Sequence, residues 1–400
     1  MKHILIIHAH WNNRGDEAAV RAIIDELRKE KVMLNIQIVS PIVYQFPYEK
    51  QEVNIIPLYP RFRNIPEFLI GCIFKGKLVW TMEGQAFFNA LRDSDLVIHA
   101  PGGPSLGDTY YCSEILYLLR FMAVLRENKK FVICAPSVGP FNKRTRNWLR
   151  KKIFSSAKQI VLREEISQMY LNQLLPQNSS KVTLDAAFQS KIPSETNELK
   201  LHHYKELEHF MSQDGKIVGM TITNLLWHPK YGKEKGLAEH ISLEFENVVK
   251  ELRQRGYRIL FIPQLFGIAH DNDYMRKFEV EGCFTMSEEY DCYFQQYIIG
   301  KMFALIGMRY HSNIFSAKMG IPFISISYEQ KMEGFINKIN YQKYCIDIKK
   351  LTAKRIIDKF TSLEKDYDSI KRYLDEIGPE LRSKSYETTE ILLRELRCEA

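Results

Sequence analysis

The sequence predicts an α/β fold of two Rossmann-like domains with a helical C-terminal tail. Its 400 residues exceed what one core of ~100–200 residues usually serves. Short, mostly apolar runs alternate with helical stretches, as strands buried on both faces of a parallel sheet do. The alternation stops at a polar stretch near residue 190 and then restarts. These observations favour two doubly wound parallel sheets.

In the first half, strands and helices are expected in turn. The strands are predicted at His3–Ala9, Ile36–Ser40, Asp95–Ala100, Phe131–Ser137, Gln159–Arg163 and Val182–Asp185. The helices are predicted at Asp16–Glu30, Ser113–Glu127, Lys143–Ser156 and Glu165–Leu174. This half, residues 1–190, forms the predicted N-terminal domain.

The polar, non-periodic stretch Gln189–Tyr204 is predicted to be a linker. After it come strands and helices at Ile217–Thr223, Leu237–Arg255, Arg258–Pro263, Ala304–Met308, Ser312–Met319 and Pro322–Ser327. A second domain is therefore expected over 205–350, with a helical tail over 351–400. Such a pair of domains is a glycosyltransferase-B-type arrangement, in which ligands sit at the carboxyl ends of the strands, facing the cleft.

Composition narrows the class of partner. The net charge is +8, which either serves solubility or favours an anionic ligand such as a phosphate or a lipid headgroup. Seven cysteines stand scattered without CxxC spacing, so a zinc or redox site is disfavoured and a reducing cytosol is expected. The N-terminus runs into a strand without a signal peptide, and no apolar run reaches the ~18 residues of a spanning helix. We expect a cytoplasmic protein that could lie peripherally on the inner face of the membrane.

Three loops follow predicted strands and could bind a ligand. Asn13-Arg14-Gly15-Asp16-Glu17 opens the first helix, where an anion is favoured, although Asp16 could instead cap the helix. It is neither a G-x-G-x-x-G motif nor a P-loop, which disfavours a dinucleotide site. The loop with Gly102, Gly103 and Asp108 could wrap a ligand or be an ordinary turn. Ser137-Val138-Gly139-Pro140-Phe141 is a rigid turn.

Arg309-Tyr310-His311-Ser312 lies where a predicted strand ends and a helix begins. In an extended segment residues two apart point the same way, so Arg309 and His311 are expected to converge on one ligand. Arginine binds phosphate or carboxylate with two hydrogen bonds, and histidine can donate a proton near neutral pH. A lone histidine is usually structural, but this pair favours function.

Two D-x-D patterns resemble a metal–nucleotide signature. Asp93-Ser94-Asp95 precedes its strand, which puts it at the wrong edge of the sheet, and Asp271-Asn272-Asp273 could line the cleft. Chance explains both patterns easily, so no essential metal and no cofactor are predicted.

Taken in order, these blocks resemble the polysaccharide pyruvyl transferase family over residues 3 to 335. The blocks are Asn13–Ala18, Gly102-Gly103, Ser137–Phe141, Val161–Glu165 with Ser167, Asp185–Phe188, Gly307–Ala317 and Gly320–Lys331. The resemblance implies transfer of the enolpyruvyl unit of phosphoenolpyruvate onto two hydroxyls of one sugar, forming a ketal in a capsule or exopolysaccharide precursor. The acceptor could be linked to polyprenyl pyrophosphate, and no nucleic acid is involved.

The resemblance also implies roles for single residues. Arg309, His311, Arg163, Ser312 and, more weakly, Lys331 would bind the donor, which puts the acceptor side in residues 1–190 and the donor side in 205–350. Because the reaction needs an acid to protonate the donor, His311 would also be that acid. Asp16 would be the base for the acceptor hydroxyl. Asn13, Gly102, Gly103 and Asp108 are expected to contact the acceptor or shape its loop.

Two stretches depart from the family pattern or stand outside it. The glycine loop is short and is followed by Tyr110 and Tyr111, where relatives often have Trp or His. The insert 57–80 is basic and apolar, which suits either a membrane surface or core packing. The basic stretch 143–158 could likewise meet anionic lipid or be a solvated helix face. Two other functions compete: a nucleotide-sugar-dependent glycosyltransferase and a glycan- or anion-binding module without activity.

Overall fold

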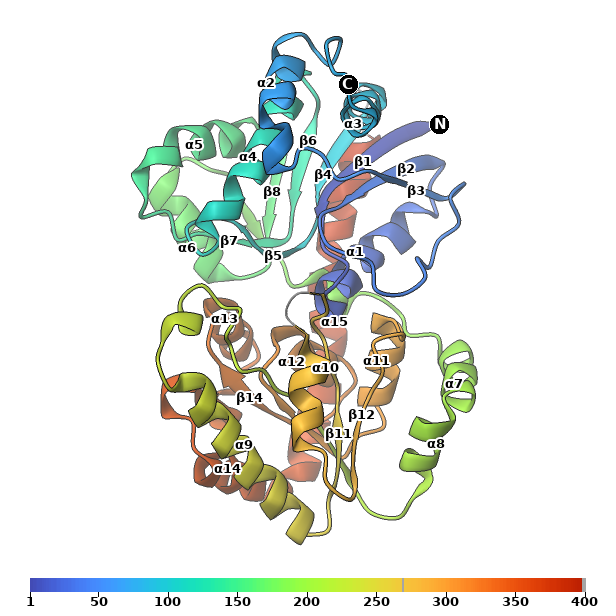
Figure 1. The fold of residues 1–400 in the computed structure, drawn as a ribbon, viewed down its shortest axis with the longest axis vertical. Helices are drawn as coiled ribbons and strands as arrows, with labels where there is room; N and C mark the ends of the chain where they lie inside the picture. The colour runs from blue at the N-terminus through green and yellow to red at the C-terminus, as the bar shows by residue number, and fades with distance from the viewer. Residues whose placement is uncertain (268–269, 398–400) are drawn as a thin grey trace. The chain divides into compact units, whose positions relative to one another are not determined.

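The computed structural model describes residues 1–267 and 270–397, with the side chains of residues 104 and 105 outside the description (Figure 1). The chain forms two compact units. The first contains residues 1–11, 19–190 and the chain from 383 onward, and the second contains 12–18 and 191–382. The first turn of helix α1 thus belongs to the second unit, whereas the rest of this helix belongs to the first.

A parallel sheet forms the centre of the first unit. Among the described residues it has seven strands in the order β3-β2-β1-β4-β6-β8-β9. Their bounds are β1 Lys2–Ala9, β2 Val32–Ile38, β3 Val53–Ile56, β4 Leu96–His99, β6 Phe131–Cys134, β8 Gln159–Leu162 and β9 Lys181–Val182. A separate parallel pair consists of β5 Gly102–Leu106 and β7 Pro136–Val138.

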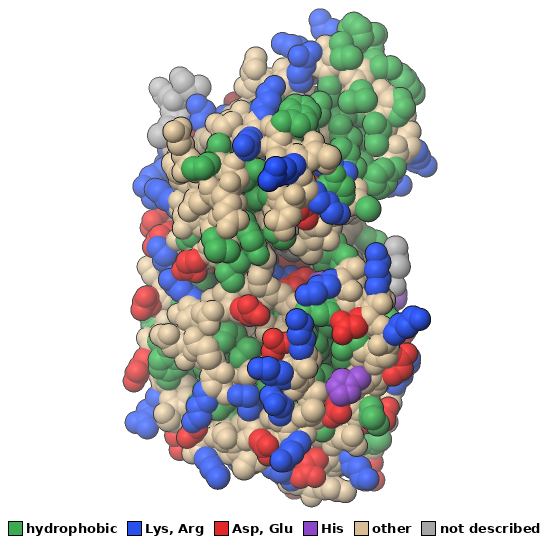
Figure 2. All heavy atoms as spheres, turned by 90° about the vertical axis from the view of Figure 1, so that its left-hand side faces the viewer, with side chains coloured by type: hydrophobic (Ala, Val, Ile, Leu, Met, Phe, Trp, Pro, Cys, Tyr) green, Lys and Arg blue, Asp and Glu red, His purple; other side chains and the backbone are tan. Residues whose placement is uncertain are grey.

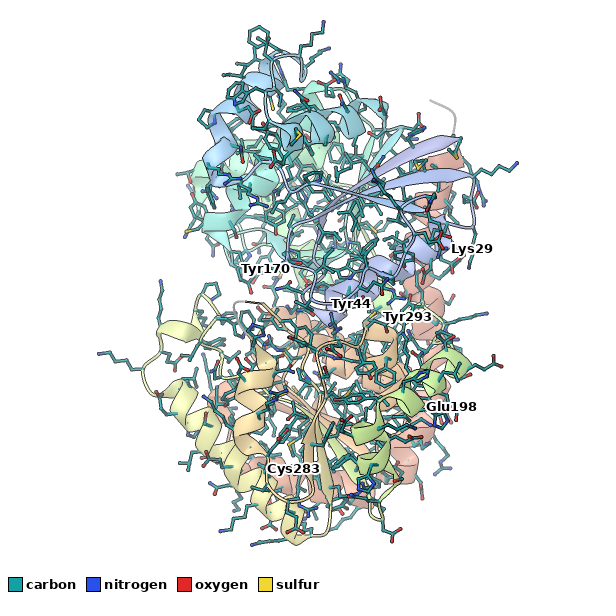
Figure 3. All side chains as sticks on the ribbon, turned by 45° about the vertical axis from the view of Figure 1, so that its right-hand side comes forward. Lys29, Tyr44, Tyr170, Glu198, Cys283 and Tyr293 are labelled. Carbon is teal, nitrogen blue, oxygen red and sulfur yellow. The ribbon has the colours of Figure 1, made fainter. Side chains whose placement is uncertain are left out.

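Helices cover both faces of this sheet (Figure 1). They are α1 Arg14–Leu27, α2 Ile65–Ile73, α3 Met82–Asp93, α4 Tyr111–Arg126, α5 Asn147–Ser156 and α6 Glu165–Leu174. Buried phenylalanines from α2, α3, α4 and β6 pack with the aliphatic residues of the strands in one core. Figure 3 shows how densely side chains fill the space around the strands.

The second unit repeats the plan with a sheet in the order β12-β11-β10-β13-β14-β15, again parallel throughout. Its strands are β10 Ile217–Thr221, β11 Arg258–Phe261, β12 Cys283–Thr285, β13 Ala304–Gly307, β14 Phe323–Ser327 and β15 Cys345–Asp347. Its helices are α7 Ser194–His203, α8 Lys205–Ser212, α9 Leu237–Gln254, α10 Asp271–Met275, α11 Cys292–Ile299, α12 Tyr310–Lys318, α13 Gln330–Lys338 and α14 Ala353–Lys365.

The last helix, α15 Tyr367–Arg397, continues past an internal Pro379. Its residues from 383 onward pack in the first unit, where Ser385 donates to the Asp185 carbonyl at 2.7 Å and Thr389 donates to Gln189 at 2.8 Å. None of the described helices is both long and apolar enough to cross a membrane.

The two parallel sheets and the helical C-terminus confirm the predicted fold class, and each predicted strand overlaps an observed one. The stretch 189–204, expected to be a linker, contains α7, and the two units divide within it, between residues 190 and 191. Pro193 precedes this helix, Asn197 donates to the Pro193 carbonyl at 2.7 Å, and Glu195 lies in the first turn with Lys200 near the end. An acidic first turn and a basic last turn suit the helix dipole. A search for apolar periodicity does not detect a helix of this kind.

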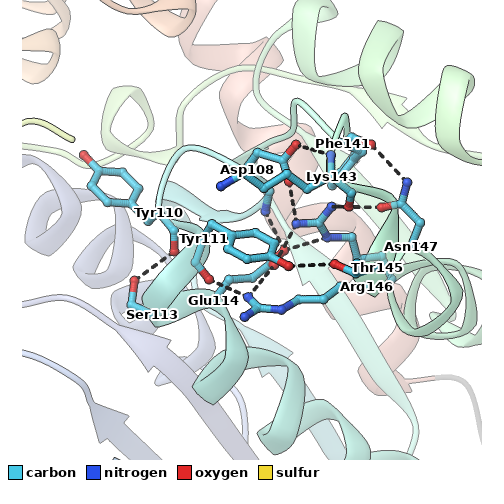
Figure 4. A network of polar contacts seen from close by, with 12 residues as sticks. Asp108, Tyr110, Tyr111, Ser113, Glu114, Phe141, Lys143, Thr145, Arg146 and Asn147 are labelled. Atoms are coloured by element: carbon cyan, nitrogen blue, oxygen red, sulfur yellow. Dashed lines mark hydrogen bonds and ion pairs between the residues drawn. The ribbon is translucent and has the colours of Figure 1, made fainter. Parts of the chain in front are cut away.

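A buried ion network links three elements of the first unit (Figure 4). Arg150 of α5 donates to Asp108 at 2.8 Å and, through two nitrogens, to Glu114 of α4 at 2.8 and 2.7 Å. The side chains of Arg150 and Glu114 are both fully buried. Burial alone would lower the pKa of Arg150, but the two carboxylates outweigh it and raise this pKa. The basic stretch 143–158 is therefore partly core, since Leu149, Ile153 and Phe154 are buried too.

In the second unit, the first turn of α1 packs closely on α12. Asn13 pairs with Leu265 in an antiparallel bridge, and the Arg14 amide donates to the Gln264 carbonyl at 2.9 Å. Gly15 lies directly against His311: a Cβ at residue 15 would be 1.8 Å from Nδ1 and 1.9 Å from Cγ of His311. Only glycine fits this contact.

We expect Arg150→Met to destabilise the first unit by about 3–5 kcal/mol, because it leaves the Glu114 carboxylate buried without its main partner. Urea unfolding measures the loss. Lys151→Met on the exposed side of the same helix is the matched control and should change the free energy of unfolding little. Equal losses in the two variants would mean that the network contributes nothing.

Gly15→Ala should cost about 1–3 kcal/mol of unfolding free energy, because the methyl group overlaps the His311 ring. His311→Gly removes that ring, so the double variant should recover part of the loss, with a coupling energy of about 1 kcal/mol or more. Gly378→Ala, at a helical site with open space around the new Cβ, is the control. Additive losses in the double variant would contradict the close packing.

Candidate functional site

The strand order of the second sheet reverses between β10 and β13, which are neighbours although two strands separate them in sequence. In open parallel sheets ligands bind beyond the carboxyl ends of the strands at such a point. Polar and aromatic side chains gather there. They are Trp227 and His228 after β10, Asp271 after β11, Arg309 and His311 after β13, and Tyr328, Glu329 and Lys331 after β14.

The backbone at the R-x-H block differs from the expectation. β13 ends at Gly307, Arg309 is the residue before α12 with an extended backbone (φ −89°, ψ 133°), and His311 lies in the first helical turn. The two-residue alternation of a strand therefore does not apply, and that part of the argument for convergence is wrong. The block instead places both residues at the N-terminal end of a nine-residue helix, which favours anions.

Arg309 is buried, with 4% of its surface exposed. Asp271 binds it with both carboxylate oxygens: Oδ2 accepts from Nε at 3.1 Å, and Oδ1 accepts from Nη2. The guanidinium also lies over the Trp227 ring, 4.8 Å from its centroid. Burial alone would lower the pKa of Arg309, but the Asp271 carboxylate outweighs it and raises this pKa. The guanidinium is thus a fixed, permanently charged group at the sheet edge.

Asp271 also orders the loop after β11. Its Oδ2 accepts from the backbone amides of Gln264 at 3.0 Å and Leu265 at 2.9 Å. The second D-x-D pattern therefore contributes a structural carboxylate that binds arginine and backbone. Within residues 1–267 and 270–397, no group of three His, Cys, Asp or Glu side chains is placed to hold a metal ion.

Lys331, a predicted donor contact, lies 15% exposed and forms an ion pair with Glu329. Glu329 in turn contacts His228 Nε2 at 3.1 Å. Burial would raise the pKa of Glu329, but Lys331 and His228 outweigh it and lower this pKa to about 2. The carboxylate is therefore charged at neutral pH, and it holds both basic groups beside the end of β14.

The first turn of α1 and the residue before it place two predicted site residues, Asn13 and Asp16, in the second unit. Asn13 Oδ1 accepts from the Gly15 amide at 2.9 Å, so Asn13 caps the helix and the alternative role of Asp16 as cap is wrong. The Asp16 side chain follows the glycine that contacts His311, is 8% exposed, and has no hydrogen-bond partner among the described residues. Ser312 is fully buried and bonds Thr221 at 2.6 Å and the Arg309 carbonyl at 2.7 Å, which fixes the turn.

Arg163 belongs to the first unit, at the end of β8, and is 2% exposed. Its Nη1 donates to Asp185 at 2.7 Å and its Nε donates to Ser137 at 2.9 Å. Ser167 accepts from the Val138 amide at 2.9 Å in the same cluster. Three separate sequence blocks thus meet around one buried guanidinium.

The glycine loop of the first unit is shaped by close backbone contact. A Cβ at Gly107 (φ +145°) would be 2.6 Å from the Gly139 carbonyl oxygen, whereas a Cβ at Gly103 would meet open space. Asp108 accepts from the Lys143 amide at 2.8 Å and from Arg150, so its carboxylate holds two loops together. Gly102 pairs with Pro136 in the small sheet.

Sequence reasoning missed a histidine cluster at the corresponding edge of the first sheet, between β1 and β4. The rings of His8 and His99 lie 4.8 Å apart, and His10 Nε2 bonds the Tyr117 hydroxyl at 2.8 Å. Burial lowers the pKa of His8 well below its usual value and that of His99 to about 4, so both are neutral near pH 7. His8 also has a left-handed backbone (φ 68°). The signal in the sequence was the His-x-His pattern at the end of the first strand.

Solved structures of low identity share this architecture. The UDP-GlcNAc 2-epimerase of Neisseria meningitidis, bound to UDP-GlcNAc, matches with a TM-score of 0.57 and 12% identity over 99% of each chain. A UGT transferase of Siraitia grosvenorii in complex with UDP matches with a TM-score of 0.60 and 10% identity over 100% of each chain. At such identities the likeness shows the fold alone, which is of the predicted glycosyltransferase-B type.

Sequence relatives are more informative. The amylovoran biosynthesis protein AmsJ of Erwinia amylovora is 25% identical over 402 residues, which cover 93% of this chain and 94% of AmsJ. Residues 13–330 match the family described as polysaccharide pyruvyl transferase. That span begins at the Asn13 cap and includes Arg163, Arg309 and His311. Because it covers well over half of the chain, this protein belongs to the polysaccharide pyruvyl transferase family, as the resemblance predicted.

Proposed function

We propose that this chain transfers the pyruvyl unit of phosphoenolpyruvate to a sugar of a polysaccharide precursor as a cyclic ketal. The observation that carries the proposal is the fixed Arg309 guanidinium beside the first turn of α12, where His311 packs on Gly15. The polysaccharide pyruvyl transferase family supports the reaction class, and AmsJ supports a role in exopolysaccharide synthesis.

Donor binding is proposed at this edge of the second sheet. Phosphoenolpyruvate carries about three negative charges, which a helix N-terminus and basic side chains stabilise. Asp271 engages Nε and Nη2 of Arg309, so the donor is proposed to meet Nη1 and the backbone of the first turn. Lys331 and Arg163 are proposed as further donor contacts.

The reaction needs one acid and one base. His311, as imidazolium, is proposed to protonate C3 of the donor, which makes C2 electrophilic. A sugar hydroxyl then forms a bond to C2 while its proton passes to Asp16. In the second half, the C2–O bond to phosphate breaks, a second hydroxyl of the same sugar bonds to C2, and its proton passes to the His311 imidazole, which restores the imidazolium. Asp16 gives its proton to the departing phosphate. The products are the ketal and inorganic phosphate, so atoms and charge balance.

Asp16 supports this assignment because its carboxylate has no partner among the described residues and follows the glycine on which His311 packs. We further propose that the acceptor is carried on a lipid such as polyprenyl pyrophosphate. Asn13, Gly102, Gly103 and Asp108 remain proposed as residues that contact the acceptor or shape its loops.

The test is phosphate release from phosphoenolpyruvate in the presence of a panel of nitrophenyl glycosides and lipid-linked sugars. Release that depends on one sugar, together with a pyruvyl ketal on that sugar, is the expected result. Thermal stabilisation by UDP and none by phosphoenolpyruvate would instead favour a nucleotide-sugar enzyme. Stabilisation without turnover on any acceptor would favour a binding module.

Arg309→Lys keeps the charge but loses the geometry that Asp271 fixes, so we expect phosphoenolpyruvate affinity to fall about 10–100-fold. Arg163→Ala should weaken binding in the same range if Arg163 contacts the donor. Titration calorimetry on folded variants measures both, and Arg276→Lys, an exposed arginine of the same unit, is the control. Unchanged affinity in both test variants would remove the arginines from the donor site.

His311→Gln should keep most donor affinity and lose turnover by about 10²–10⁴-fold, the usual range for a general acid. Affinity and turnover are measured separately, with His203→Gln at an exposed helix end as the control. In deuterium oxide the wild-type product should carry deuterium in the pyruvyl methyl group. Weak binding with normal turnover at saturation would make His311 a binding residue only.

A further inference from the structure

Exposed hydrophobic side chains gather on one short segment of the first unit, residues 61–82, which we call the α2 platform. Of the sixteen large hydrophobic residues that are exposed in the described chain, seven lie on it. They are Phe62, Leu69, Ile73, Phe74, Leu78, Trp80 and Met82, with exposed fractions from 39% to 83%. Figure 2 shows such side chains gathered at the upper end of the molecule, where Figure 1 places α2.

The exposed charge of the α2 platform has a single sign. Its basic residues Arg61, Arg63, Lys75 and Lys77 are all exposed. Its one acidic residue, Glu67, is 3% exposed and faces inward. Lysine and arginine atoms border the hydrophobic region in Figure 2. The platform thus combines exposed apolar side chains with basic side chains around them. Its complement is a partner with negative charge at its surface and an apolar layer beneath.

The platform is held rigidly from its inner side. The Glu67 carboxylate accepts from the amides of Trp80 at 3.0 Å and Thr81 at 2.7 Å, which fixes the turn that exposes Trp80. A Cβ at Gly71 would be 2.6 Å from the Phe88 ring, so α2 lies tightly on α3. The outward side chains are therefore presented by a packed element, and their exposure is not explained by a loose loop.

The charge pattern selects among partners for this surface. Two copies of the chain meeting through the same patch would place its four cations near one another, which an isologous contact disfavours. Protein interfaces in general are depleted in lysine. A bilayer takes up aromatic and aliphatic side chains below its headgroups and attracts basic residues when its lipids are anionic.

We propose that the α2 platform docks this protein on the surface of an anionic lipid bilayer, with its apolar side chains in the headgroup region and its cations against lipid phosphates. The docking does not rest on the proposed reaction. Where the acceptor is lipid-linked, it would hold the protein at the surface where that acceptor lies.

Co-sedimentation with vesicles tests the docking. Wild-type protein should bind vesicles of phosphatidylcholine mixed with phosphatidylglycerol at least tenfold more strongly than phosphatidylcholine alone, and high salt should reduce this binding. Lys75→Gln/Lys77→Gln should lower the partition coefficient on anionic vesicles about tenfold. Lys233→Gln/Lys235→Gln, exposed cations with the same spacing in the second unit, should leave it unchanged.

The apolar contribution has its own pair of variants. Ile73→Ser/Trp80→Ser removes exposed side chains of the platform, whereas Leu199→Ser/Leu243→Ser removes side chains of similar exposure in the second unit. Only the first pair should weaken vesicle binding, and phosphate release with a soluble glycoside should stay normal in both. Equal binding by all variants would overturn the proposal, as would a dimer in solution that only the platform variants disrupt.

Discussion

The contact between Asp271 and Arg309 is the constraint on which the arrangement of the second unit's site depends. The same carboxylate binds the guanidinium and the amides of Gln264 and Leu265. That loop pairs with the first turn of α1, and Gly15 of this turn lies against His311, two residues after Arg309. Arg309, Asp271, the loop with Gln264 and Leu265, the first turn of α1 and His311 are thus linked in a closed series of contacts. A shift of one of them would displace both the arginine and the histidine.

The electrostatics follow from burial. A buried cation is costly unless a carboxylate accompanies it, and Arg309 and Lys331 each have one, in Asp271 and Glu329. Both carboxylates hold their cations in place, so an anion that bound here would need little further ordering of these side chains. Because each cation is paired with a carboxylate, the net positive charge at this sheet edge is small. Recognition of an anion here therefore depends more on where the unused N–H groups point than on the number of cations.

The strands and the long helices were predictable, because apolar runs and periodicity report directly on burial. The predicted strands also placed Arg163 and Arg309 correctly at the carboxyl ends of their strands. The sequence did not reveal which acidic side chain binds which basic one. Asp271 stood in a pattern that resembles a metal signature, and the buried Arg150 stood in a stretch that resembles a solvated helix face. Such partners meet only through tertiary packing. The same holds for Gly15: a side chain at this position would overlap His311, which lies nearly three hundred residues later in the chain.

Aromatic residues at the same edge argue against a site built mainly for stacking on sugar rings. Trp227 lies under the Arg309 guanidinium, and its Nε1 donates to Thr223 at 3.0 Å. One face of the indole therefore contacts the arginine, and its single N–H donor is already bonded to Thr223. Burial raises the pKa of Tyr328, which keeps its hydroxyl protonated beside the same guanidinium. The aromatic groups here orient a fixed cation, whose charge and geometry suit a phosphate or carboxylate group.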